Sequence, residues 1–315
     1  MLIKEKSKRN EILSANSYKT NLWNYLQNKD ESSYSDIKTL GLSQDGSPFM
    51  DAESTEYFRE KLKEKSVVRK EATVLKNDVD SSSIATFPSK SMATWTKSGE
   101  HDLFADALEI KDVDVNLEYN ILSNLITIHE DFLNNPQTKI EKIILDTFAH
   151  NFAKAEDKAF IEGSGQNEPF GILADDKIKS LSATKELKLD DLKKLFFSLD
   201  SEYRENAKWI MNDKTALYLQ SLKDGQGSYL WNQYDGTFMG KEILISNFMP
   251  DIDAGSKPIA FGDFSNYWII ERQNPTIKKL SEMFILKQHQ GFIMREYLDA
   301  KLMDKDSVLT LVIEG

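Results

Sequence analysis

The most informative stretch of the sequence runs from Asn151 to Leu173 and reads NFAKAEDKAFIEGSGQNEPFGIL. It continues an apolar pattern whose members lie three and four residues apart: Ile140, Ile143, Ile144, Phe148, Phe152, Ala155, Ala159 and Phe160. This spacing places the apolar side chains on one face of a helix. Pro136 is a favoured first helical residue, and a helix from there to Glu162 would be about 40 Å long. The sequence therefore predicts a long spine helix.

A turn follows the predicted helix. Its defining residues are Gly163, Gly165, Pro169 and Gly171. Glycine adopts the left-handed backbone conformation that ends many helices, and proline keeps the helix from resuming directly. We interpret these four residues as a structural turn.

A phosphate-binding or dinucleotide-binding loop is the functional alternative for Gly163-Ser-Gly165. It fails because the third glycine position is Glu168, and because the turn follows a helix where such loops follow a strand. Ser164 also lacks the Gly-x-Ser-x-Gly context of a nucleophilic serine, since Glu162 stands two residues before it. The turn therefore predicts neither a cofactor site nor a catalytic residue.

Metal-ligand spacing is absent from the sequence. The histidines are scattered: His101, His129, His150 and His289. Glu130 and Asp131 directly follow His129, and adjacent residues point in different directions on a helix. With no cysteine, disulfides and thiolate metal sites are excluded. Lys223-Asp-Gly225 is interpreted as a solvated turn in preference to a catalytic lysine. We expect no metal, no cofactor and no catalytic residue.

Composition indicates a soluble globular protein. Of the 315 residues, 40% are hydrophobic and 29% are charged. No apolar run reaches the roughly 18 residues that a membrane helix needs, and the N-terminus lacks the apolar core of a signal peptide. The 51 acidic and 40 basic residues give a net charge of −11, the wrong sign for a protein that grips phosphates. The basic residues form no stripe interleaved with aromatics, so sequence-specific recognition of nucleic acid is not expected.

Four segments in the same order resemble the HK97-like major capsid proteins of tailed bacteriophages. They are AEDKAFIEGSG with EPFGIL (155–173), WIMN with LKDGQGSYL (209–230), IAFGDFSNYWII (259–270) and FIMREYLDAKL (292–302). Together they cover the chain from about residue 41 to the end. The resemblance implies an α+β fold with an N-terminal arm at 41–70, an extended β-hairpin loop at 71–112, a peripheral domain at 113–186 and 264–302, and an axial domain at 187–263 and 303–315.

The local patterns agree with an α+β fold, because helices and strands mix without a regular βαβ repeat. We expect helices at 52–65, 121–134, 188–204 and 214–223. Strands are expected at 66–75, 110–120, 209–211, 243–245, 259–261 and 267–270, with two or three more in 277–302. Residues 1–40 are mostly polar and lack a core of their own. They are interpreted either as a mobile extension or as a scaffolding-like segment.

The resemblance gives the extended loop a role between subunits. Residues 77–109 have little regular apolar periodicity, and a loop of that length is unusual in a compact domain unless it projects and finds a partner. In the family this loop lies over the neighbouring subunit. Trp95, Lys97 and Phe104 are therefore candidates for intersubunit contact, although Trp95 would also suit an ordinary core.

Some members of the family link their subunits covalently through a loop lysine, an asparagine and a glutamate base. The loop here carries Lys90 and Lys97, but the approximate partner region at 284–294 contains neither asparagine nor glutamate. Asn274 and Glu282 lie nearby in the sequence. We expect no isopeptide bond, with Lys97 solvated or ion-paired.

The sequence predicts a non-enzymatic major capsid protein. By resemblance it would assemble in the cytoplasm of a bacterial host, as pentamers and hexamers, into an icosahedral virion shell around double-stranded DNA. Its expected partners are further copies of itself, portal and scaffold or protease proteins, and DNA bound without sequence preference, but no membrane. The alternatives are an encapsulin that encloses cargo enzymes and, from another class, a hydrolase that uses pairs of carboxylates.

Overall fold

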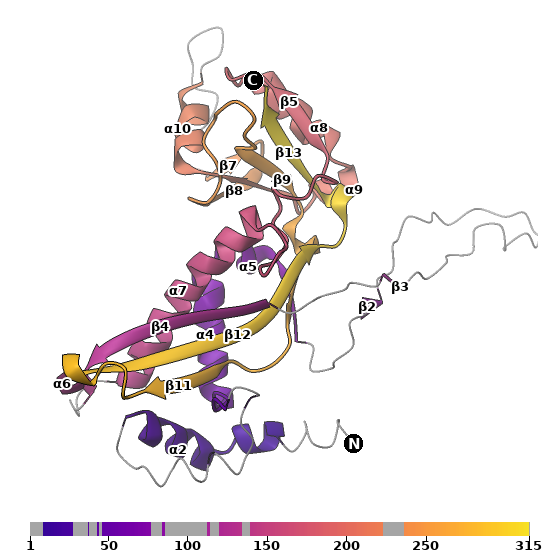
Figure 1. Ribbon diagram of the computed structural model, residues 1–315. Helices are drawn as coiled ribbons and strands as arrows, with labels where there is room; N and C mark the ends of the chain where they lie inside the picture. Colours follow the sequence, from indigo (N-terminus) through magenta and orange to yellow (C-terminus); the bar gives the residue numbers. More distant parts are fainter. Residues whose placement is uncertain are drawn as a thin grey trace, which may run out of the picture.

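The protein is described by a computed structural model over residues 9–27, 37, 43, 46–76, 84–85, 112–113, 120–133, 139–222 and 236–314. The described chain mixes helices and strands, which confirms the α+β class. It forms two parts (Figure 1). We call the elongated part, with the longest helix and strands, the spine domain. The part at one end of it, which contains a six-stranded sheet, we call the small domain.

The spine domain is built on helix α7 (Ile140–Glu162), which confirms the predicted spine helix from Ile140 onward; Pro136 lies outside the described residues. Helix α4 (Ala52–Lys65) packs beside α7, with Phe58 meeting Phe152 edge to face at a ring-centroid distance of 5.6 Å. The Asp51 carboxylate caps α4 by accepting a hydrogen bond from the Ser54 amide.

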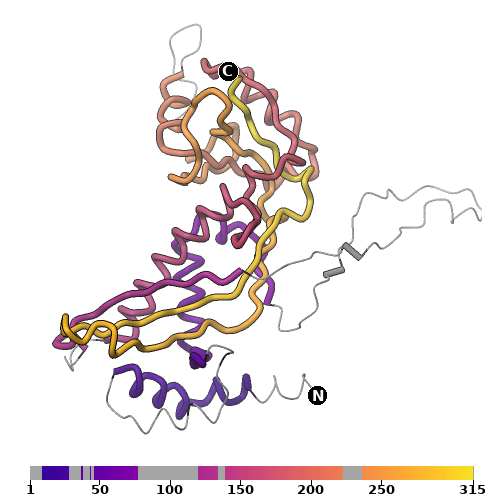
Figure 2. The backbone as a smooth tube through the Cα atoms, viewed as in Figure 1, coloured from indigo at the N-terminus to yellow at the C-terminus, as the bar shows by residue number. Residues whose placement is uncertain are grey.

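A five-stranded sheet covers the two helices, and Figure 2 shows its long strands running beside α7. Strand β12 (His289–Leu302) pairs antiparallel with β4 (Asn120–His129), β10 (Tyr267–Glu271) and β11 (Thr276–Leu280). Strand β1 (Thr73–Lys76) extends the sheet parallel to β10. Alternate residues of β12 are buried, which is the pattern of a sheet with one face on a core.

The helix predicted at 121–134 was wrong. Residues 120–129 form β4, and only Glu130–Leu133 is helical, as α6. Leu122, Ile126 and Ile128 pack against the core, while the residues between them point outward. A ladder with β12 from His129 to Asn120 satisfies the backbone of the whole strand, and this long-range pairing overrides the local helical spacing.

The strand predicted at 66–75 was wrong in its first half. Residues Val67–Glu71 form the short helix α5, and the chain becomes extended only at β1. The Asp157 carboxylate on α7 accepts hydrogen bonds from the amides of Val67 and Val68, so it caps the first turn of α5. A cap supplied from a remote helix outweighs the strand preference of the two valines.

The N-terminal extension contains a helix that is packed into the spine domain. Helix α2 (Asn16–Leu26) buries Leu22 and Trp23 in the same apolar cluster as α4 and α7. The Tyr18 hydroxyl donates to the Phe49 carbonyl at 2.7 Å, and the Trp23 indole donates to Ser54 Oγ at 3.1 Å. The described part of residues 1–40 is thus not a free extension, because its apolar face completes the core.

The small domain is a six-stranded sheet in the order β5-β13-β9-β6-β8-β7. The strands are Ser180–Ala183 (β5), Lys208–Met211 (β6), Thr237–Phe238 (β7), Lys241–Ile245 (β8), Ile259–Gly262 (β9) and Val308–Ile313 (β13). Trp209 stacks on Phe261 with ring centroids 4.1 Å apart in the core of this domain. Strand β5 lies in this sheet, although the predicted boundary placed it in the peripheral domain.

The helix predicted at 188–204 is two helices, α8 (Leu189–Ser198) and α9 (Ser201–Arg204). Leu199 is extended, and the Asp200 side chain caps α9 by accepting from the Glu202 amide. Asn212 is the N-cap of helix α10 (Asp213–Ser221), and its side chain accepts a hydrogen bond from the Thr215 amide. The expected strands at 209–211, 243–245, 259–261 and 267–270 are confirmed as β6, β8, β9 and β10.

The remaining elements are short. Strands β2 (Ile84–Ala85) and β3 (Asp112–Val113) pair antiparallel with each other, as the two arms of a hairpin do. The described residues also include the 3₁₀ turns η1 (Phe264–Asn266), η2 (Ile285–Lys287) and η3 (Lys305–Ser307). The predicted contact residues Trp95, Lys97 and Phe104 lie outside the described residues, as does most of the strand predicted at 110–120.

Candidate assembly surfaces and the junctions behind them

The glycine turn closes the spine helix through backbone contacts that leave no room for side chains. The Gly171 amide donates to the Gly163 carbonyl at 2.8 Å, and the Ile172 amide donates to Phe160 at 2.8 Å. A Cβ on Gly163 would lie 2.2 Å from the Pro169 carbonyl oxygen, and one on Gly171 would lie 2.5 Å from the Gly163 nitrogen. Gly165 has φ +77°. The structure thus brings the four predicted turn residues together.

Behind this turn, Arg69 of α5 is the centre of a buried ionic cluster that the sequence analysis missed. Its guanidinium donates to Glu156 of α7 through Nε at 2.8 Å and Nη2 at 2.6 Å. It also donates through Nη1 to Glu271 of β10 at 2.6 Å. Arg59 of α4 contacts the other oxygen of Glu271 at 2.7 Å. Glu296 of β12 lies 3.7 Å from Arg69. The cluster therefore joins helices α4 and α5, the spine helix and the sheet.

Burial and neighbouring charges shift the pKa values of the groups in this cluster. Burial raises the pKa of Glu296 well above its ordinary value, and the charge of Glu156 adds to the effect. Glu271 is also buried, but the cations Arg69 and Arg59 more than offset that burial and hold its pKa below the ordinary value. For Arg69, the surrounding carboxylates outweigh the burial and raise its pKa. Arg69 is therefore a permanent cation, and each of its three guanidinium nitrogens donates to a carboxylate.

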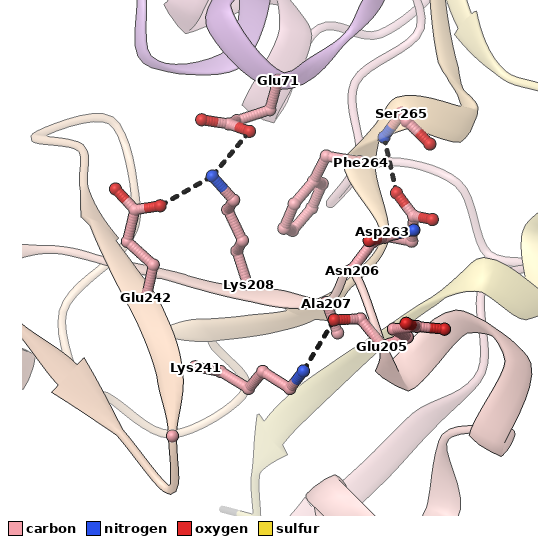
Figure 3. Close-up of a pocket in the computed structure, with 11 residues that line it drawn as sticks. Glu71, Glu205, Asn206, Ala207, Lys208, Lys241, Glu242, Asp263, Phe264 and Ser265 are labelled. Carbon is pink, nitrogen blue, oxygen red and sulfur yellow. Dashed lines mark hydrogen bonds and ion pairs between the residues drawn. The ribbon is translucent and has the colours of Figure 1, made fainter.

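A second junction lies between the spine domain and the small domain (Figure 3). Lys208 of β6 reaches Glu71 of α5 at 2.8 Å and Glu242 of β8 at 2.6 Å. Lys241 donates to the carbonyl of Glu205 at 2.7 Å. These groups border a polar pocket of about 410 Å³. Lys208 lowers the pKa of Glu242, as an ion pair does. The Lys208–Glu71 ion pair thus bridges the domains, while the Lys208–Glu242 pair lies within the small domain.

The face of the five-stranded sheet that points away from α7 carries apolar side chains on two neighbouring strands. Ile121 and Leu125 of β4 are 53% and 44% exposed. Tyr297 stands opposite Ile121 and Ile293 opposite Leu125 on β12, and both are half-buried. We call these four residues the outer sheet patch. Ser123 and Arg295 lie between the two apolar pairs on the same face. Two exposed aliphatic residues on a face that also carries polar residues indicate a contact surface.

The end of the spine domain farthest from the small domain carries a second apolar surface, which we call the distal patch. It consists of Phe132 after β4 and Met283, Ile285 and Leu286 around η2. Leu286 is 99% exposed. The Glu130 amide donates to the Gln288 carbonyl at 2.9 Å, which holds the two loops together. The small domain also exposes apolar residues, Phe197 on α8 and Leu217 on α10. Such residues at both ends indicate contacts at both ends.

Enzyme-like constellations are absent from the part of the chain that the structure describes. It contains no group of three or more histidine, cysteine, aspartate or glutamate residues that could hold a metal ion. The rings of His129 and His289 are in contact across β4 and β12, with centroids 5.1 Å apart. This is an edge-to-face contact of two rings, and it is not part of a larger group of potential metal ligands among the described residues. Among the described helices, none has the length and apolar character to cross a membrane.

An elongated α+β subunit with apolar surfaces at both ends and on its sheet is the form of a protein that associates with copies of itself. Residues 46–313 match the phage capsid family, so the chain belongs to this family. No curated protein matches the sequence.

Solved structures agree with this assignment. The capsid of a native GTA particle is 26% identical, with a TM-score of 0.64 over 79% of this chain and 91% of that chain. A structure from Mycobacterium phage Adephagia is 13% identical, with a TM-score of 0.51 over 79% and 90%. A virus-like particle from Pyrococcus furiosus is 14% identical, with a TM-score of 0.50 over 82% and 98%. The last two show a shared fold.

The protein is therefore a major capsid protein that associates with itself into a phage-like shell. Its role is structural and not enzymatic, and its place is the virion capsid. Sequence reasoning found the family through the turn and the collinear segments. It missed the Arg69 cluster and both apolar patches, because their members are distant in sequence and meet only after folding.

Proposed function

We propose that this subunit forms pentamers and hexamers that close into an icosahedral shell around double-stranded DNA. In this proposal the small domain is the axial domain, placed near the symmetry axes, and the spine domain is the peripheral domain. The observation that carries the proposal is the distribution of exposed apolar residues over the outer sheet patch, the distal patch and the small domain. A closed shell requires each copy to contact several neighbours through different surfaces.

The hairpin that begins at β2 and ends at β3 supplies one of these contacts in the proposal. It extends to a neighbouring subunit, where Trp95 and Phe104 cover the outer sheet patch. Burying one large aromatic side chain contributes about 2 to 3 kcal/mol. Many such modest contacts per subunit add through multivalency, and each alone is weak enough to let a misplaced subunit leave.

The charge of the chain fits a container better than a DNA-binding protein. A net charge of −11 keeps the shell from gripping the phosphates of packaged DNA. DNA is therefore held by enclosure and without sequence preference. Portal and scaffold or protease proteins complete the assembly, which takes place in the cytoplasm of a bacterial host.

Electron microscopy of the expressed protein tests the proposal. Wild-type protein is expected to form closed particles, and particles from infected cells should contain nuclease-protected DNA. Leu125→Lys should fold normally but fail to form shells, because it charges the outer sheet patch. Thr147→Lys, an exposed position on α7 away from this patch, is the matched control. A compact monomer under all conditions would contradict the proposal, and particles that enclose protein cargo without DNA would favour the encapsulin alternative.

A further inference from the structure

The buried cluster around Arg69 has more acidic groups than basic ones. Two guanidinium groups, those of Arg59 and Arg69, face three carboxyl groups, those of Glu156, Glu271 and Glu296. Arg69 and the three glutamates are each at most 2% exposed. An uncompensated charge in such a site is costly, so the cluster is most stable when one carboxyl group is neutral.

Geometry identifies the neutral group. Glu156 accepts two short bonds from Arg69 in the fork arrangement that a carboxylate prefers. Glu271 contacts a different arginine through each oxygen. Both oxygens of Glu296 are buried without a hydrogen-bond partner, and the nearest guanidinium nitrogen of Arg69 is 3.7 Å away. Glu296 thus lacks the bonds that would stabilise its anion.

The charged and titratable groups near Glu296 come from each element packed around it. They are Arg59 of α4, Arg69 of α5, Glu156 of α7 and Glu271 of β10. Asp157 and Tyr267 interact electrostatically with Glu156, and Lys76 does so with Glu271. Asp157 is already held by Ser66 and by the first amides of α5. The balance of charge therefore depends on the two arginines and the three glutamates.

We infer that Glu296 carries a proton in the folded subunit and that its neutral state leaves both arginines free to hold α4 and α5 to Glu156 of the spine helix and Glu271 of the sheet. When the proton is lost to water at alkaline pH, the O–H bond breaks and a third buried carboxylate appears beside two guanidinium groups. Repulsion from Glu156 and Glu271 then loosens Arg69 and with it α5. Because α5 leads into β1 and on toward β2, the root of the hairpin loosens too.

The pH dependence has a definite sign. In the unfolded chain Glu296 would ionise near its ordinary pKa of about 4.3. In the folded chain burial raises that pKa, so folding takes up a proton at any pH between the two values. The stability that Glu296 confers is complete at low pH and is lost as the pH rises toward the folded pKa. A glutamine, which resembles the neutral acid, has no such loss.

Unfolding of full-length wild type and Glu296→Gln by urea at pH 6, 7 and 8, in matched assembly states, tests the inference. The folding equilibrium constant of the wild type should fall relative to that of the variant by up to about tenfold per pH unit. Glu242→Gln, which removes an ionised carboxylate, is the control and should show no such trend. Hydrogen exchange in α5 and β1 at pH 8 should be faster in the wild type than in Glu296→Gln.

Two further measurements fix the position of the proton. At pH 6, Glu296→Gln should be at least as stable as the wild type, whereas Glu156→Gln should lose tenfold or more in its folding constant. The infrared spectrum of the wild type at pH 6 should contain a band from a protonated carboxyl group that Glu296→Gln lacks. Three results would each overturn the inference. The first is a ratio of the wild-type folding constant to that of Glu296→Gln that does not change with pH. The others are a wild type without this infrared band, and a stable Glu156→Gln beside a destabilised Glu296→Gln.

Discussion

Arg69 connects three separate parts of the spine domain through a single guanidinium group. Replacing it by methionine keeps much of the side-chain volume but leaves Glu156 without its cation and Glu271 with Arg59 alone. Removing one partner of a buried pair typically costs about 3 to 5 kcal/mol. We expect the free energy of unfolding of Arg69→Met to fall by this amount in urea titrations.

The matched control for this variant is Lys214→Met. Lys214 pairs with Asp251 where both side chains are largely exposed, so its loss should change stability by less than about 1 kcal/mol. Equal losses in the two variants would mean that burial does not strengthen the Arg69 pairs.

Gly171 is a second residue whose role is set by its surroundings. A Cβ there would meet backbone atoms, the Gly163 nitrogen at 2.5 Å and the Ile161 oxygen at 2.6 Å, which cannot move aside without disturbing the end of α7. Gly171→Ala should therefore lower stability by about 3 kcal/mol. Gly240→Ala has open space at its Cβ but φ +75°, so it should lose only about 1 kcal/mol. Thermal unfolding compares the two, and a similar shift in both would argue against a steric role for Gly171.

These residues show what the sequence could and could not predict. The turn glycines stand close together after a periodic helix, so their role as a helix end was predictable. The partners of Arg69 come from residues 156, 271 and 296, and no local pattern links them. In the sequence, Arg69 resembles an ordinary surface residue, because the carboxylates that surround it are brought near only by folding.

At the scale of elements, the errors have physical causes. The sequence pattern of β4 predicts a helix because Ile121 and Leu125 are apolar although their side chains point outward. These two residues hide the apolar–polar alternation of a half-buried strand. These two residues, which make the prediction wrong, belong to the outer sheet patch. The sequence predicts a strand at α5 because the two valines favour one, and because the Asp157 carboxylate that reinforces the Ser66 cap comes from another helix. By contrast, α7 was predictable because its periodic apolar face extends over many turns.

Helix α2 provides a prediction at this scale. Leu22 is fully buried between α2 and the spine domain, and a leucine-to-alanine change in a core costs about 2 to 5 kcal/mol. Leu22→Ala should lower the thermal midpoint, and deletion of residues 1–27 should lower it further. The control is Thr20→Ala on the exposed side of the same helix. If the deletion left the midpoint unchanged, α2 would be a separate extension, as the polar composition of residues 1–40 suggested.

For the whole molecule, the collinear segments predicted the family, while the surfaces needed the structure. The Lys208–Glu71 ion pair links the spine domain to the small domain, and apolar patches lie at the far ends and on the sheet. Each patch alone is small compared with a stable interface, which buries about 1,200 to 2,000 Å² in total. Assembly therefore depends on several patches acting at once.

The last prediction concerns how the shell is held together. A covalent bond between lysine and asparagine needs a neutral amine and a carboxamide held together away from water, with a glutamate as base. Asn274 is half-buried, but Glu282 is exposed, so it lacks the desolvated surroundings of such a base. We therefore expect non-covalent shells. Boiled particles should run at the monomer mass of 36.1 kDa on a denaturing gel. A ladder of higher bands that disappears in Lys97→Ala but persists in Lys90→Ala would show that the subunits are linked through Lys97.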